Sequence, residues 1–242
     1  MNQEVLNLVF SQILTNCTSL VELMLERNKL SGTLPNSIGN LSNSLKKLAV
    51  SERSIELSFL TDLTNCTSLV ELMLERNKLS GTLPNSIGNL SNSLKNLAVS
   101  ESQLIGTIPK EIGSLRNLTS LALANNNLNG NMPSTLGEIK SMQRLYLGGD
   151  NFHGSIQNEI CLLSNLGELY AELSKLSGSI PSCIENLRSL QIPKSLEELS
   201  HIQYMNFSCN KLAGEISNEV QFKNLTPWSF MENEALCVGK MI

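Results

Sequence analysis

Residues 118–139, LTSLALANNNLNGNMPSTLGEI, constrain the fold more than any other part of the chain. The stretch fits LxxLxLxxNxLxG followed by xxPxxLGxI, with the pattern positions filled by Leu118, Leu121, Leu123, Asn126, Leu128, Gly130, Met132, Pro133, Leu136, Gly137 and Ile139. The alternating leucines predict a short strand that points them into the interior of a coil. The Asn follows the strand, where its side-chain amide can hydrogen-bond to backbone groups that the turn leaves unpaired.

The Asn position recurs along the chain, and its spacing counts the coils. It falls at Asn28, Arg53, Asn77, Ser102, Asn126, Asp150, Ser174 and Asn210, in steps of 25, 24, 25, 24, 24, 24 and 36. This period and pattern are typical of leucine-rich repeats, in which each repeat is one coil of a solenoid and contacts only its neighbours. Seven coils are therefore predicted from Leu20 to about Ser189, with Ser102, Asp150 and Ser174 as short polar replacements of the Asn.

A near-exact duplication supports the two-coil register. Residues 14–52 and 63–101 differ at one of 39 aligned positions, Lys47 against Asn96, and their offset of 49 residues equals two coils. Such a duplication adds stacking neighbours without shifting the phase of the solenoid.

The last step exceeds the period by 12 residues, because residues 187–199 lack a strand and an Asn turn. We expect a bulge or weakened junction near residues 188–200, unless the last coil docks directly on the seventh. The chain is thus divided into residues 1–14 (remnant of a preceding repeat), 15–189 (seven repeats), 190–201 (truncated repeat), 202–218 (last repeat) and 219–242 (partial C-terminal cap). Trp228 and Phe230 are candidates to cover the last leucines; the alternative for Trp228 is a partly exposed loop aromatic.

Composition narrows the class of function. The chain is 41% hydrophobic but 4% aromatic, which predicts an aliphatic core, and its net charge of −4 is scattered. This distribution argues against a nucleic-acid partner. No stretch is long and apolar enough to span a membrane, and the first residues have neither a basic region nor a cleavage site typical of a signal peptide.

Cysteines and sequons bear on the compartment. Cys161 and Cys183 are 22 residues apart, nearly one coil; they are expected to form a disulfide in an oxidising compartment, or to be two buried thiols that fill small gaps. Cys17 and Cys66 are copies of one cysteine and are expected to be buried. Glycosylation is predicted at the sequons Asn16, Asn40, Asn65, Asn89, Asn117 and Asn224. Asn206 is left out because it lies on a predicted strand, where a glycan would obstruct the concave face.

No catalytic, metal-binding or cofactor-binding pattern is found. The two histidines, His153 and His201, are interpreted as solvated residues, and nucleotide-binding glycine loops and kinase catalytic motifs are absent from the sequence. The chain is therefore not expected to be an enzyme or to need a cofactor.

The outward positions of the strands form columns on the predicted concave sheet, about 4.8 Å apart from coil to coil. Tyr146 and Tyr170 occupy one column on adjacent coils, and aromatic side chains with a hydroxyl group suit peptide or protein contact. The candidate ligand-binding residues are Tyr146, Tyr170, Arg144, Glu168, Gly148, Gly149 and Asn125, the two glycines leaving room for a ligand backbone. The alternative is that the tyrosines only cover the sheet.

Several segments resemble a known family. The tail GxIPxxIGxL, the prolines at Pro35, Pro84, Pro109, Pro133 and Pro181, and the segments FLTDLTNCTSL, LPNSIGNLS and SFMENEALC are similar to ectodomains of plant leucine-rich-repeat receptor-like serine/threonine kinases, especially the subfamily that senses microbial peptides. The resemblance implies an α/β fold: a right-handed solenoid (horseshoe) with a concave parallel sheet, and short 3-10 turns and short strands on the convex side.

The same resemblance implies a function. It points to a plasma-membrane receptor whose extracellular part binds a peptide or protein ligand and pairs with a leucine-rich-repeat co-receptor kinase, in a plant defence signalling pathway. Kinase and membrane helix would belong to parts of the parent outside this chain, and Cys237 matches the first cysteine of the family's C-terminal cap but has no partner after it. The alternatives are a secreted, kinase-free inhibitor or scaffold that binds a cell-wall hydrolase, and a non-functional fragment.

Overall fold

The computed structural model describes residues 19–25, 34, 36–41, 43–51, 57–186, 204–216 and 227–238. Several sequence-based expectations fall outside these ranges: the remnant repeat at 1–14, the truncated repeat at 190–201, and the residues Asn16, Cys17, Asn28, Arg53, His201 and Asn224. In the described ranges no helix combines the length with the apolar character needed to cross a bilayer.

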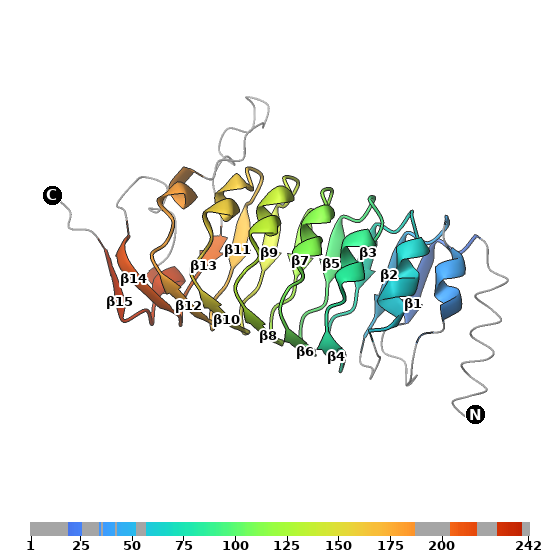
Figure 1. The fold of residues 1–242 in the computed structure, drawn as a ribbon, viewed down its shortest axis with the longest axis horizontal. Coiled ribbons are helices and arrows are strands. Elements are labelled where there is room, and N and C mark those ends of the chain that lie inside the picture. Colours follow the sequence, from blue (N-terminus) through green and yellow to red (C-terminus); the bar gives the residue numbers. More distant parts are fainter. Residues whose placement is uncertain are drawn as a thin grey trace.

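The chain winds into an elongated solenoid whose coils stack side by side (Figure 1). One strand per coil builds an eight-stranded parallel sheet, made of β1 (Glu22–Leu25), β2 (Lys47–Val50), β3 (Glu71–Met73), β5 (Asn96–Ala98), β7 (Ser120–Ala122), β9 (Arg144–Tyr146), β11 (Glu168–Tyr170) and β13 (Tyr204–Asn206). The predicted α/β solenoid with a parallel sheet is thereby confirmed.

A second parallel sheet and a row of short helices complete each coil. The second sheet has seven strands in the described residues: β4 (Ser80–Thr82), β6 (Gln103–Gly106), β8 (Asn127–Gly130), β10 (Asn151–Gly154), β12 (Lys175–Gly178), β14 (Lys211–Ile216) and β15 (Ala235–Val238). The helices are η1 (Asn36–Leu41), α2 (Phe59–Asp62), η2 (Leu63–Asn65), η3 (Asn85–Asn89), η4 (Lys110–Ser114), η5 (Ser134–Glu138), η6 (Asn158–Leu162), η7 (Ser182–Asn186) and η10 (Pro227–Phe230).

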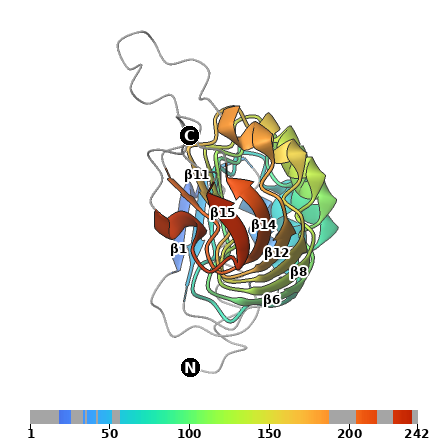
Figure 2. The same cartoon turned by 90° about the vertical axis from the view of Figure 1, so that its left-hand side faces the viewer.

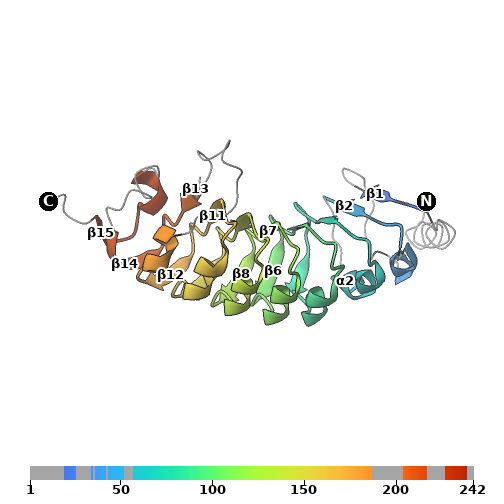
Figure 3. The same cartoon turned by 90° about the horizontal axis from the view of Figure 1, so that it is seen from above.

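The solenoid is curved. Seen from above, the helices η1 to η7 follow the outer edge of the arc and the eight-stranded sheet follows the inner edge (Figure 3). The end-on view shows each coil as a loop that closes around its own interior (Figure 2). The eight-stranded sheet is therefore the concave face and the helices are on the convex face, as predicted.

The core is the stack of inward leucines. The strand pairing puts Leu48 beside Leu72, Leu72 beside Leu97, and so on through Leu121, Leu145, Leu169 and Met205. All are almost fully buried. Since burying one such side chain contributes roughly 1.5–3 kcal/mol, this column alone stabilises the stack substantially.

A ladder of buried asparagines joins successive coils. Asn126 donates from Nδ2 to the carbonyls of Val99 (2.9 Å) and Leu123 (2.8 Å), and its Oδ1 accepts from the amide of Leu104 (3.1 Å). Asn77 and Asn210 donate in the same way to a carbonyl in their own coil and to one in the preceding coil. Buried backbone groups at each turn are thereby satisfied by a side chain.

The C-terminal segment contains a further ladder residue that the sequence analysis missed. Asn233 donates to the carbonyls of Phe207 (2.9 Å) and Phe230 (3.0 Å) and accepts from the amide of Leu212 (3.0 Å). Its distance of 23 residues from Asn210 was the available signal. Residues 227–238 thus continue the repeat geometry beyond β14, and β15 extends the second sheet by pairing with β14.

The two C-terminal aromatics behave differently. Phe230 packs against the core with its ring centroid 6.4 Å from that of Phe207. Trp228 is 70% exposed, so the expectation that it covers the last leucines is wrong and the alternative of an exposed aromatic holds. Within the short helix η10 it is Ser229 that is buried, so the side chain of Trp228 lies on the solvent side of the helix.

The long step in the sequence leaves no gap in the concave sheet. β11 pairs directly with β13, with Glu168 opposite Tyr204 and Leu169 opposite Met205. Asn210 bridges to the coil of β11 by donating to the carbonyl of Ala171 and accepting from the amide of Leu176. The last coil therefore docks directly on the seventh, while residues 187–203 lie outside the described ranges.

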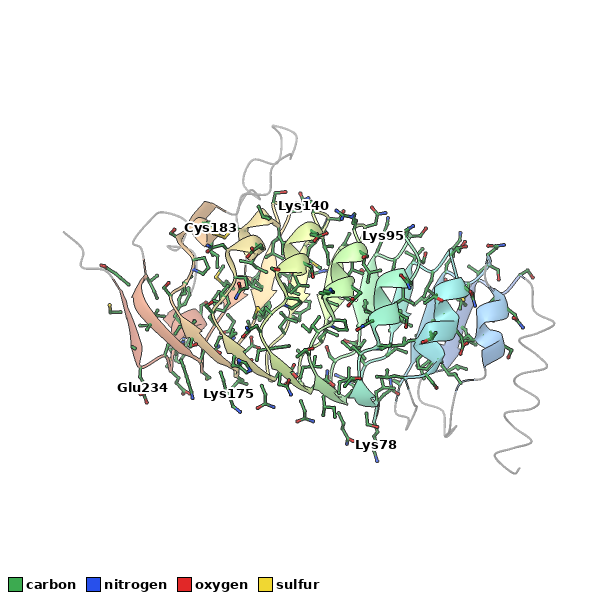
Figure 4. The ribbon with its side chains drawn as sticks, viewed as in Figure 1. Lys78, Lys95, Lys140, Lys175, Cys183 and Glu234 are labelled. Atoms are coloured by element: carbon green, nitrogen blue, oxygen red, sulfur yellow. A yellow bond between two sulfur atoms is a disulfide. The ribbon has the colours of Figure 1, made fainter. Side chains whose placement is uncertain are left out.

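The convex side carries the disulfide and the sequons. Cys161 in η6 and Cys183 in η7 are joined by a disulfide, with Cα atoms 5.8 Å apart. Figure 4 shows Cys183 and Lys140 at the edge of the helices, opposite the edge of Lys78, Lys175 and Glu234. Cys66 is buried, and burial raises the pKa of its thiol to about 11. Four described sequon asparagines are exposed on or beside the convex helices: Asn40, Asn65, Asn89 and Asn117.

Candidate ligand-binding face

Three adjacent strands place all three tyrosines of the chain on one part of the concave face. Tyr146 ends β9, Tyr170 ends β11 and Tyr204 begins β13. The register aligns Tyr146 with Tyr170, while Tyr204 is aligned with Glu168. We name this region, made of the outward residues of β9, β11 and β13 and of the turns that follow them, the tyrosine face.

The two predicted tyrosines form a ring pair. The ring centroids of Tyr146 and Tyr170 are 5.3 Å apart, with the ring planes tilted by 32°. This separation is within the range in which aromatic pairs attract each other. The Tyr146 hydroxyl donates a hydrogen bond to the carboxylate of Glu168.

Burial and the carboxylate together keep this pair neutral. Burial, followed by the hydrogen bond to Glu168, raises the pKa of Tyr146 to about 12. Burial, followed by the charges of Glu168 and Glu172, also raises the pKa of Tyr170. Both hydroxyl groups therefore remain protonated and can donate hydrogen bonds at any physiological pH.

The carboxylate of Glu172 occupies the space above Gly148. A Cβ atom added to Gly148 would lie 2.6 Å from Cδ of Glu172 and 2.8 Å from its Oε2. Oε2 is buried and has no hydrogen-bond partner, and burial raises the pKa of Glu172. The room that was predicted here for a ligand backbone is thus filled by a side chain from the next coil.

Gly149 is needed for the backbone conformation of the turn. Its φ is +72°, and an added Cβ would lie 2.3 Å from Oδ1 of Asn125. In seven coils the residue before the ladder position is left-handed, with φ between 53° and 72°: Arg76, Glu101, Asn125, Gly149, Leu173, Cys209 and Glu232. Only glycine adopts this conformation without a steric cost.

The structure adds residues that sequence analysis did not select. Tyr204 and Leu173 are 56% and 60% exposed on the tyrosine face, and Met231 is 42% exposed in the next turn. Tyr204 directly precedes the inward Met205, just as Arg144 precedes Leu145, and that offset was the available signal. Leu173 had no such signal, because its exposure follows from the turn conformation.

The charges differ between the two ends of the concave face. Toward the N-terminus, Lys47 pairs with Glu71 at 2.9 Å and Arg76 pairs with Glu101 at 3.2 Å. On the described part of the tyrosine face, Arg144 is the one basic residue on the strands that carry Glu168 and the three tyrosines. Among the described residues no group of three or more potential ligands could hold a metal ion. The arrangement suits contact with another polypeptide.

Known proteins share the repeat and the architecture. Residues 19–41, 68–90 and 117–139 match the family described as Leucine Rich Repeat. No curated protein matches the sequence.

Three solved structures are informative. The plant peptide hormone receptor RGFR1, solved with RGF2, is 32% identical with a TM-score of 0.77, over 96% of this chain and 38% of that one. The Arabidopsis receptor kinase HAESA, solved with the peptide hormone IDA and the co-receptor SERK1, is 29% identical with a TM-score of 0.73, over 92% and 39%. A plant ice-binding protein is 21% identical with a TM-score of 0.61, over 89% of this chain and 80% of that one. At this identity the likeness concerns the fold alone.

The chain spans about two fifths of the length of the two receptors. The chain is a leucine-rich-repeat solenoid, similar in architecture to the ectodomains of plant receptor kinases.

Proposed function

We propose that this chain is the ligand-recognition module of a plant cell-surface receptor kinase, and that it binds a peptide through the tyrosine face. The observation that carries the proposal is the Tyr146–Tyr170 ring pair on the concave sheet, flanked by the exposed Tyr204. Tyrosine is enriched at the energetically dominant positions of protein interfaces, because its ring buries a large area and its hydroxyl group remains hydrogen-bonded.

Two of the similar structures support a peptide as the ligand. RGFR1 was solved with RGF2, and HAESA with the peptide hormone IDA and the co-receptor SERK1. We accordingly propose a leucine-rich-repeat co-receptor kinase as a second partner, and an extracellular location at the plasma membrane. The disulfide between Cys161 and Cys183 suits that compartment. Glycans at the exposed convex asparagines would leave the concave face free.

The finer parts of the proposal rest on the resemblance of the sequence. The motifs SFMENEALC and LPNSIGNLS favour a microbial peptide as the ligand and a role in defence. Arg144, Glu168, Gly148, Gly149 and Asn125 complete the proposed site around the tyrosines. Gly149 and Asn125 act in it by shaping the turn, and Glu168 by orienting Tyr146.

Replacing Tyr170 by Ala is expected to weaken peptide binding by about 10- to 30-fold, as loss of a central interface aromatic does. The probe is a set of peptides selected from a random heptapeptide display library on the full chain, resynthesised and titrated by calorimetry. His153→Ala is the matched control, because His153 is exposed on the second sheet in β10. Equal affinity of every selected peptide for the wild-type protein and Tyr170→Ala would contradict the proposed face.

A further inference from the structure

We propose that Glu172 and the Tyr146–Tyr170 ring pair form a subsite for one positively charged side chain, Lys or Arg, of the peptide. The inference rests on the proposed peptide-binding function and deepens it by specifying the chemistry of one ligand residue.

The first step is the position of Glu172. β11 ends at Tyr170, but the next amide, that of Ala171, still donates to the carbonyl of Asn206 in the neighbouring coil. Ala171 is buried, so Tyr170 and Glu172, on either side of it, point out of the concave face. The Glu172 carboxylate reaches across to the coil of β9, where Gly148 offers the space that any larger residue would take. It therefore lies in the same coil pair as the two rings.

The second step is that one oxygen of this carboxylate has no partner inside the protein. Oε2 of Glu172 is buried without a hydrogen-bond donor, whereas Glu168 accepts from Tyr146. The ion pairs found in the described residues are Lys47–Glu71, Arg76–Glu101 and Arg116–Glu138, and none involves Glu172. An unpaired carboxylate held partly out of water is costly, and its raised pKa reflects that cost.

The third step is the chemistry that would satisfy it. An ammonium or guanidinium group would donate to the Glu172 carboxylate in a charge-assisted hydrogen bond. The same cation could lie on the ring of Tyr146 or Tyr170, where the negative ring face attracts it. A metal ion would need more carboxylate or imidazole ligands than the described residues bring together here.

The test begins with the composition of the selected peptides. Heptapeptides selected on the wild-type chain should be enriched in Lys or Arg at one position. Selection on Glu172→Gln, which is close to isosteric, should lose that enrichment. Glu159→Gln on the convex helix η6 is the matched control and should keep it.

A double-mutant cycle then isolates the contact. One selected peptide is made with Arg and with the neutral isostere citrulline, or with Lys and acetyl-lysine. Either the peptide change or Glu172→Gln alone is expected to weaken binding by about 10- to 100-fold, and both together by no more than one alone. Gly148→Ala provides a second variant, which retains the charge but pushes the carboxylate aside, and should give the same loss.

Each outcome decides the proposal. Coupled losses in the cycle support the cation subsite. Additive losses, or no enrichment of basic residues while Tyr170→Ala still weakens binding, overturn the subsite and leave the peptide-binding face standing. Peptides that bind independently of both Glu172 and Tyr170 overturn the subsite and the proposed function together.

Discussion

Replacing Asn126 by Ala is expected to lower the free energy of unfolding by about 3–9 kcal/mol, because three buried backbone groups lose their partner at roughly 1–3 kcal/mol each. These are the carbonyls of Val99 and Leu123 and the amide of Leu104. Alanine has no polar side-chain atom that could pair with these groups. The loss is measured by urea denaturation, and locally by faster hydrogen exchange at the Leu104 amide.

The neighbouring asparagine is a matched control. Asn127 begins β8 and its side chain is exposed, so Asn127→Ala is expected to change stability by no more than about 0.5 kcal/mol. An equal loss of unfolding free energy for the two substitutions would contradict the prediction. It would mean that water replaces the hydrogen bonds of Asn126 at little cost in stability.

Replacing Asp150 by Asn is expected to raise the free energy of unfolding at pH 8 by about 2–4 kcal/mol. Asp150 occupies the ladder position and is only 5% exposed. Its Oδ1 accepts from the amide of Leu128 at 2.8 Å, but its Oδ2 is buried without a partner. By the repeat geometry, Oδ2 stands where the amide of Asn126 donates to two carbonyls, so an ionised carboxylate faces acceptors and an amide would supply donors.

The pH dependence follows from the pKa. Burial raises the pKa of Asp150 from 3.8 to about 7. Because the folded state holds this proton more tightly than the unfolded state, the stability of the wild type falls as the pH rises from about 4 to 7 and stays low above that. Below pH 4 the carboxyl group is protonated in both states and can donate like an amide. The advantage of Asp150→Asn should therefore vanish at pH 4.

The measurement is urea denaturation of both proteins at pH 4 and pH 8. Asp62→Asn on the convex side changes the only other aspartate of the chain and should leave the pH profile as it is. The reciprocal change, Asn126→Asp, should introduce a loss of stability with rising pH. If the free energy of unfolding of Asp150→Asn follows the same pH dependence as that of the wild type, the ionisation of Asp150 does not cause the pH dependence.

Much of the fold follows from the sequence because the repeat is local. The inward leucines, the Asn turns and the convex helices are each specified within one coil of about 24 residues, and stacking only repeats them. For Asp150, the repeat pattern shows that a short polar residue replaces the Asn of the ladder. That its second oxygen lacks a donor became clear only from the neighbouring coil.

The candidate site was predictable in part for the same reason. The register of one strand with the next places Tyr146 beside Tyr170 in the sequence pattern and in the structure. The filling of the space above Gly148 by Glu172 was not predictable, since it depends on how one coil's side chain leans onto the next.

The sequence by itself determined the repeat, its phase and the residues that face inward, because these depend on spacing along the chain. The tertiary structure alone decided how coils meet where the spacing breaks: β13 docks on β11 across the long step, Asn233 continues the ladder, and Trp228 is left exposed. The physical reason is that an unpaired strand edge or buried backbone group costs free energy. The coils therefore pack so that these groups are hydrogen-bonded, whatever the number of residues between them.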